Sequence, residues 1–173
     1  MEVTWLPFLL RPGMPPEGMP VPSYARGSQA TALRSRLKQM AEANGLEMVF
    51  GEWVPNSHRA LEAAEYARTQ GKHDPFHKIV FRKYYGDGQD ISRWDVLRSA
   101  ALEAGLDPDD MQEQTESGRY RAVVGQHFEE AQHIGVSSIP TYVLSGRYAV
   151  VGAQTYEVFL QAIERFQSEG RET

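Results

Sequence analysis

The sequence predicts an α/β fold in which a strand is followed by several helices, two further strands and a final helix. Residues 3–10 are rich in strand-forming side chains and end at Arg11-Pro12-Gly13, which predicts one buried strand. From residue 28 onwards apolar residues recur about every 3.6 positions, the period of an α-helix. After Gly135 the period changes to 2, which predicts a β-hairpin over 141–151 turning at Ser145-Gly146.

The predicted helices are placed by their capping residues. Residues 12–22 hold five prolines and two glycines and are expected to connect the first strand to the helices without regular structure. Asn56 is a good N-cap, and the pairs Asp74-Pro75 and Asp107-Pro108 put a capping carboxylate before a proline in the first turn. Ser92 with Asp95 resembles a capping box. The expected helices cover 28–44, 56–71, 74–84, 92–105, a short segment from 108, 120–133 and 156–167.

Composition narrows the function classes. The chain has 173 residues, a mass of 19.5 kDa and a formal net charge of −5, which argues against a clustered basic face for nucleic acid. No apolar run reaches the length of a membrane span. The N-terminus lacks a basic start and is cut by Pro7 and Pro12, so it is a poor signal peptide. We therefore expect no nucleic-acid or membrane partner and a cytoplasmic location.

Cysteine is absent from the sequence. This excludes disulfides, thiolate metal ligands and a thiol nucleophile within the chain. His73 and His77 have the i, i+4 spacing of a helical zinc pair, but Asp74-Pro75 starts a helix between them. No glycine-rich phosphate motif is present. We therefore predict no metal and no cofactor, and we assign no catalytic residue.

Four segments carry a resemblance to a known family. They are WLPFLLRPGMPPEG at 5–18, PNSHRALEAAEYAR at 55–68, DISRWDVLRSAALEAGLD at 90–107 and GVSSIPTYVLSGRYAVVGAQ at 135–154. Together and in this order they resemble the DsbA family of thioredoxin-fold proteins, most closely its FrnE-like subgroup of predicted cytoplasmic dithiol oxidoreductases, although Ser57 replaces the usual Thr. The resemblance implies a thioredoxin-like domain formed by 1–24 and 135–173, with a mainly helical insertion at 25–134.

The resemblance also identifies what this sequence lacks. In the family, a central strand and a Cys-x-x-Cys helix precede the strand that residues 3–10 resemble. We therefore expect an N-terminally truncated thioredoxin-like fold that is redox-inactive by itself, because disulfide exchange needs a thiolate. Either the missing strand and helix are encoded in frame before Met1, or the chain is a natural cysteine-free form. An in-frame stop codon directly upstream of Met1 would favour the natural form.

The predicted substrate-binding residues form one loop. In the family the bond equivalent to Ile139-Pro140 is cis, which leaves the backbone of the preceding residue able to bind an extended peptide. Ser138, Ile139, Pro140 and Thr141 are the predicted contacts, although spacing alone equally fits Pro140 as an ordinary turn residue. The remaining candidates have a structural interpretation before a binding one: the helix N-cap Asn56, and the helix entry formed by Gly152, Ala153 and Gln154.

Two other function classes stay open. One is a non-catalytic module that binds an extended peptide or a protein partner, and the other resembles the glutathione-dependent 2-hydroxychromene-2-carboxylate isomerases. The Gly-Ala-Gln turn and Asp90-Ile91-Ser92 favour the FrnE-like side. An exposed sheet face also predicts a homodimer with an interface at Trp5, Phe8 or the face near Tyr142. The alternative is that the N-terminal strand shifts and pairs with the hairpin directly.

Overall fold

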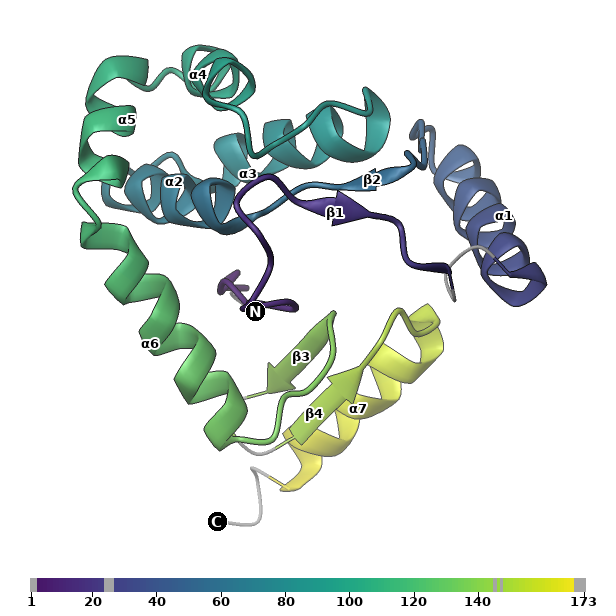
Figure 1. The fold of residues 1–173 in the computed structure, drawn as a ribbon. Helices are drawn as coiled ribbons and strands as arrows, with labels where there is room; N and C mark the ends of the chain where they lie inside the picture. Colours follow the sequence, from purple (N-terminus) through teal and green to yellow (C-terminus); the bar gives the residue numbers. More distant parts are fainter. Residues whose placement is uncertain (1–2, 24–26, 145, 147, 170–173) are drawn as a thin grey trace. The chain divides into compact units, whose positions relative to one another are not determined.

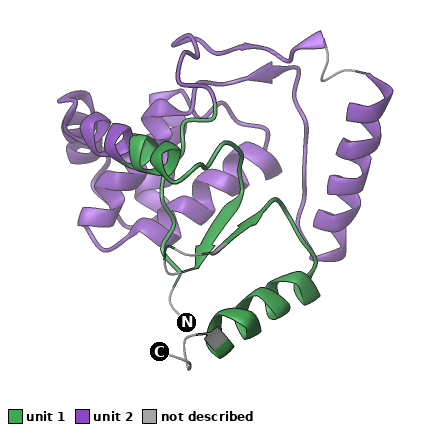
Figure 2. Ribbon diagram, turned by 90° about the horizontal axis from the view of Figure 1, so that it is seen from below, with its two compact units in different colours: residues 1–10, 127–173 green, residues 11–126 purple. Residues whose placement is uncertain are grey.

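A computed structural model describes residues 3–23, 27–144, 146 and 148–169. The chain divides into two compact units, Arg11–Gln126 and the combination of Met1–Leu10 with His127–Thr173 (Figure 2). The elements in chain order (Figure 1) are β1 Met19–Pro20, α1 Ser28–Ala43, β2 Trp53–Val54, α2 His58–Thr69, α3 His73–Phe81, the π-helix η2 Arg82–Gly86, α4 Trp94–Glu103, α5 Pro108–Glu116, α6 Arg119–His133, β3 Thr141–Leu144, β4 Tyr148–Val151 and α7 Tyr156–Glu169.

The core of the larger unit lies between α2, α3, α4 and α5. Helices α2 and α4 face it with alanines, and Phe76, Leu97 and Met111 are its largest fully buried apolar side chains. Alanine carries no bulky side chain, so the helix backbones can approach closely around these three larger residues. The buried alanines are Ala60, Ala63 and Ala67 on α2 and Ala100, Ala101 and Ala104 at α4.

The start of α5 agrees with its prediction. Asp107 Oδ1 accepts hydrogen bonds from the N–H groups of Asp109 (2.9 Å) and Asp110 (3.1 Å), and Pro108 occupies the first helical position. The predicted capping box at α4 is wrong. The N–H and the hydroxyl of Ser92 both donate hydrogen bonds to Asp90 Oδ1. The N-cap residue of α4 is Arg93.

A small antiparallel ribbon was missed in the segment expected to lack regular structure. Met19 pairs with Val54 and Pro20 with Trp53. Gly18 turns the chain into this ribbon with φ of 81°, and a side chain on it would collide with the backbone of Val54. Two-residue strands are too short to show a period in the sequence, so periodicity could not have revealed this ribbon.

The smaller unit contains the predicted hairpin and last helix. β3 and β4 pair antiparallel from Thr141 opposite Val151 to Leu144 opposite Tyr148. Tyr142 points to α7 and contacts Phe159 edge to face, with ring centroids 4.7 Å apart. Phe8 packs on Phe128 of α6 at 5.2 Å.

The predicted buried strand at residues 3–10 is wrong. These residues have no strand or helix structure, and Val3, Trp5 and Leu6 are exposed. A strand is defined by hydrogen bonds to a neighbour, and in the described part of the chain β3 and β4 pair only with each other. Strand-forming side chains alone therefore did not produce a strand. None of the described helices is long and apolar enough to cross a membrane.

Candidate functional site

A shallow groove lies on one face of the β3–β4 hairpin. It has a volume of about 170 Å³ and is lined by the segment from Ile134 to Ser138 and by the hairpin itself. Side chains alternate along β3, so Tyr142 faces α7 while its neighbours Thr141 and Val143 line the groove. The hairpin thus has one face packed on a helix and one face open.

The groove is apolar with a few hydroxyl groups. Its aliphatic walls come from Ile134, Val136, Val143, Ala149 and Val151. Its polar side chains are Ser137, Ser138 and Thr141, and none of the described residues that line it has an ionisable side chain. General acid–base catalysis needs a positioned titratable group. The groove is therefore suited to binding rather than to proton transfer.

The predicted loop residues lie at one end of this groove. Ser138 and Thr141 line it, and Thr141 Oγ1 donates a hydrogen bond of 2.7 Å to the carbonyl oxygen of Ser138. The Ile139-Pro140 peptide bond is cis. Ile139 is 49% exposed, and within the described part of the chain its backbone N–H and C=O make no hydrogen bond. These two groups are available to an extended ligand.

Gly152 and Gln154 hold the loop and the helix entry in place. The N–H of Gly152 donates to the carbonyl oxygen of Pro140 at 2.7 Å, which ties the end of β4 to the start of β3. Its φ of 84° is one that glycine adopts without strain. Gln154 Nε2 donates to the carbonyl oxygen of Val151 at 2.8 Å. Both residues therefore have structural contacts in the same unit as the loop.

Asn56 belongs to the other unit and connects two segments there. Its Nδ2 donates to the carbonyl oxygens of Met14 (2.9 Å) and Pro15 (3.0 Å), and its Oδ1 accepts from the N–H of His58 (2.8 Å). The side chain is buried. Helix α2 begins at His58 with Ser57 as its N-cap residue, so the prediction of Asn56 as the N-cap is wrong by one residue. Asn56 nevertheless accepts the N–H of the first helical residue through its side chain. It also fixes the proline-rich segment to α2.

The sequence interpretation identified the loop but missed the apolar wall opposite it. The alternation in the hairpin could have revealed the wall, because Thr141 and Val143 share a face with their cross-strand neighbours Val151 and Ala149. The segment 134–137 gives no such signal. Its contribution depends on how it turns after α6, which ends at His133.

A family model settles the classification. The model described as a DSBA-like thioredoxin domain matches residues 1–164. The chain belongs to this family. Its fold is therefore thioredoxin-like, as predicted, while the FrnE-like subgroup stays a prediction.

Two individual proteins are similar to this chain over most of its length. The uncharacterized protein YwbO of Bacillus subtilis is 29% identical over 166 residues, covering 94% of this chain and 81% of that protein. A probable DsbA oxidoreductase from Streptomyces coelicolor superposes with a TM-score of 0.84 at 26% identity, over 92% of this chain and 73% of that one.

A more distant structure shares the fold. A 2-hydroxychromene-2-carboxylate isomerase has a TM-score of 0.69 at 19% identity, with coverage of 83% of this chain and 70% of the isomerase. At this identity the likeness establishes the fold alone.

The role of Asn56 can be tested by an isosteric change. Asn56→Asp keeps the oxygen that accepts from the N–H of His58. It replaces the NH₂ group that donates to the carbonyl oxygens of Met14 and Pro15 with an oxygen atom that repels them. We expect the free energy of unfolding, measured by urea denaturation, to fall by about 2 kcal/mol. Asn44→Asp is the matched control, because Asn44 is exposed and donates to one carbonyl. It should cost about 1 kcal/mol or less, and an equal loss in both variants would contradict the assigned role.

Proposed function

We propose that this chain provides the polypeptide-binding surface of a DsbA-like thiol–disulfide oxidoreductase domain and catalyses no disulfide exchange by itself. The single observation that carries the proposal is the pairing of an open binding loop with a sequence that has no cysteine. Membership of the DsbA-like family supplies the reaction class. The ligand we propose is an extended segment of a protein or peptide.

The chemistry of the groove supports an extended, partly apolar ligand. Exposed Ile139 has a backbone N–H and C=O with no hydrogen-bond partner among the described residues, and it follows Ser138 at one end of a groove with aliphatic walls. A peptide in extended form can exchange main-chain hydrogen bonds with such groups and place every second side chain into an apolar groove. Hydrogen bonds to the main chain of a peptide do not depend on its sequence. We therefore expect many different peptides to bind, with a preference for those that carry apolar side chains.

The same residues argue against chemistry at this site. Disulfide exchange begins with the attack of a thiolate on a sulfur atom. Among the described residues of the groove, no ionisable side chain lies beside the hydroxyl groups of Ser137, Ser138 and Thr141, and a hydroxyl without an adjacent base is a weak nucleophile. Binding without bond cleavage is the activity that these residues support.

The binding proposal is tested with a fluorescein-labelled insulin B chain whose cysteines are S-carboxymethylated. Fluorescence anisotropy should show saturable binding to the wild-type chain. Ile139→Lys places a charge beside the unpaired backbone groups and the apolar groove, so the dissociation constant should rise about tenfold or more, equivalent to about 1.4 kcal/mol.

Leu102→Lys is the matched control for this experiment. Leu102 lies in the other unit and is 65% exposed, so the substitution adds the same charge to an exposed apolar position outside the groove. Its affinity should equal that of the wild type. Equal weakening in both variants would show that net charge, rather than the loop, controls binding, and absence of wild-type binding would overturn the proposal.

The absence of redox activity is a separate prediction. In the insulin reduction assay with dithiothreitol, the purified chain should give the same rate of turbidity as buffer, because it offers no thiolate. A thioredoxin at equal concentration is the positive control. A rate clearly above buffer, persisting after further purification, would contradict this prediction.

A homodimer forms the second part of the proposal. Trp5 and Leu6 are exposed in the same unit as a hairpin of only two strands, and such a sheet is marginally stable without further cover. Tyr142 already packs on Phe159 of its own chain. We therefore place the interface between copies on residues 3–10 and not on the Tyr142 face. A second copy would remove these apolar side chains from water.

Sedimentation equilibrium at tens of micromolar tests this assembly. We expect twice the chain mass of 19.5 kDa. Trp5→Glu should shift the protein toward the monomer, because it buries a carboxylate in the proposed interface. Leu102→Glu adds the same charge elsewhere and should remain dimeric. A wild-type monomer at this concentration would rule out the dimer.

A further inference from the structure

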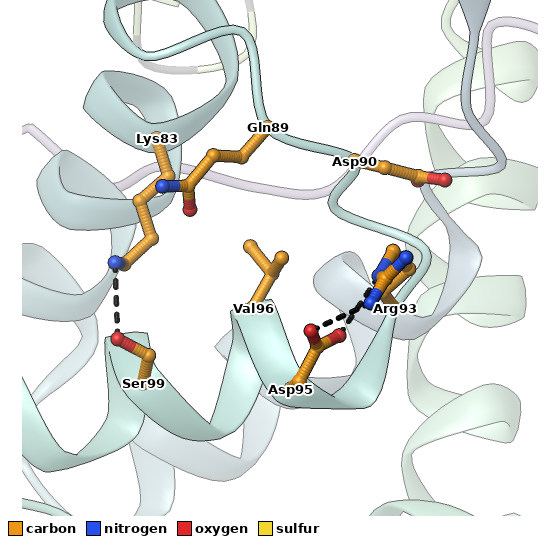
Figure 3. Close-up of a pocket in the computed structure, with 7 residues that line it drawn as sticks. All are labelled: Lys83, Gln89, Asp90, Arg93, Asp95, Val96 and Ser99. Atoms are coloured by element: carbon orange, nitrogen blue, oxygen red, sulfur yellow. Dashed lines mark hydrogen bonds and ion pairs between the residues drawn. The ribbon is translucent and has the colours of Figure 1, made fainter.

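A second hollow lies in the larger unit, formed entirely by residues 83–99 (Figure 3). Its volume is about 460 Å³ and it opens to solvent between η2 and α4. Lys83 comes from η2, Val96 and Ser99 from α4, and Gln89 and Asp90 from the segment that joins these helices. The loop at 134–141 contributes nothing to it.

Lys83 is the unusual residue of this hollow. Its relative exposure is 6%, and its Nζ donates to Ser99 Oγ at 3.2 Å. Among the described residues no carboxylate oxygen lies within 4.0 Å of this ammonium group. Lysine is rarely buried unless it is paired directly, so the absence of a close carboxylate here is unusual.

Neighbouring cations in the same unit do have such partners. Arg82 is paired with Glu103 at 2.7 Å, and Arg98 with Asp109 at 2.6 Å. Arg93, on the rim of the hollow, is paired with Asp95 through two hydrogen bonds of 2.9 and 2.8 Å. Among the described residues that line the hollow, Lys83 is therefore the cation without a direct ion pair, although Glu103 acts on it over a longer distance.

The backbone holds Lys83 in this position. Phe76, Val80 and Lys83 are all buried and have the i, i+4, i+7 spacing of one helix face, so the lysine occupies a core position. The helix then widens into the π-turn of η2, where the N–H of Asp87 bonds the carbonyl of Arg82. Short π-helical segments are rare in proteins, and those that occur often lie at functional sites. The N–H of Gln89 donates to the carbonyl of Lys83 at 2.8 Å, which positions Gln89 at the hollow.

We propose that this hollow binds a small organic carboxylate whose carboxylate group pairs with Lys83. The ammonium group and the Ser99 hydroxyl can both donate to one carboxylate, the amide of Gln89 can donate as well, and Val96 offers an apolar wall to a short aliphatic part. Asp90 lies at the same hollow, and its negative charge disfavours a dianion such as phosphate more than a singly charged carboxylate. The ligand would supply the direct ion pair that the described residues do not give Lys83.

The test is a titration of the full chain with sodium propionate, followed by ¹H–¹⁵N chemical shifts. Gln89, Val96 and Ser99 should shift together and saturate with a dissociation constant of about 1 mM or below. Propionamide has the same shape as propionate but no charge. Inorganic phosphate is an anion with a higher charge and no carboxylate group. Both should bind about tenfold more weakly or not at all.

Lys83→Met should abolish propionate binding while keeping the aliphatic volume of the side chain. Lys78→Met is the matched control, since Lys78 is exposed on α3, and it should retain binding. Without propionate, Lys83→Met should melt near or above the wild-type temperature, because a buried ammonium group without a direct ion pair has been removed. A large drop in the melting temperature would show a structural role for Lys83, and the propionate and propionamide titrations of the wild-type chain would then decide the proposal.

Other outcomes decide as well. Saturation that persists in Lys83→Met, phosphate binding tighter than propionate, or no saturation by about 50 mM propionate, far weaker than any specific site of this class, would each overturn the proposal. If Lys83→Met does not fold, the comparison of propionate with propionamide on the wild-type chain still decides. Ile139→Lys should leave propionate binding unchanged, so this site and the peptide groove can fail independently.

Discussion

Close packing of alanine faces is the constraint on which the larger unit depends. Because α2 and α4 present alanines to the core, their backbones approach closely around Phe76, Leu97 and Met111, and little space remains for larger side chains. That packing fixes α3 against both helices, and through α3 it fixes the buried position that Lys83 occupies in the next turn. A volume change at the alanines would therefore reach the hollow beside η2.

The two proposed binding sites use different chemistry on different units. The groove on the β3–β4 hairpin has aliphatic walls, hydroxyl groups and unpaired main-chain groups, and so recognises features common to every polypeptide. The hollow in the helical unit has a buried ammonium group, with no carboxylate of a described residue within 4.0 Å, and a short apolar wall, which suit the small carboxylate that we propose. Neither requires the thiolate that disulfide exchange needs, which explains how a cysteine-free sequence retains organised binding surfaces.

The sequence predicted the helices and turns that depend on interactions between residues close together in the chain. The cap at Asp107, the helices of the larger unit and the hairpin follow from side chains within a few residues of each other. Predictions failed where a distant partner decides the outcome: residues 3–10 form no strand because strand pairing is not local, and the Met19–Pro20 ribbon depends on residues at 53–54. The burial of Lys83 was not predicted, because a lysine side chain is normally expected to be exposed to solvent even when its neighbours along the helix are apolar.

Among candidate site residues, the loop at 138–141 could be found because a resemblance pointed to it. The apolar wall opposite this loop could have been predicted only from the cross-strand register of the hairpin. Asn56 illustrates a third case, since its capping role follows from its position before a helix, whereas its bonds to Met14 and Pro15 join residues that are far apart in sequence.

Pro140 has a consequence for how the hairpin edge behaves in a crowded solution. An open strand edge invites pairing with other chains and, if long and regular, can seed fibres. β3 has only four residues, and the proline immediately before it has no N–H to continue a ladder in that direction. The edge therefore suits the one short extended segment that we propose as its ligand, and it offers no template for an indefinite stack.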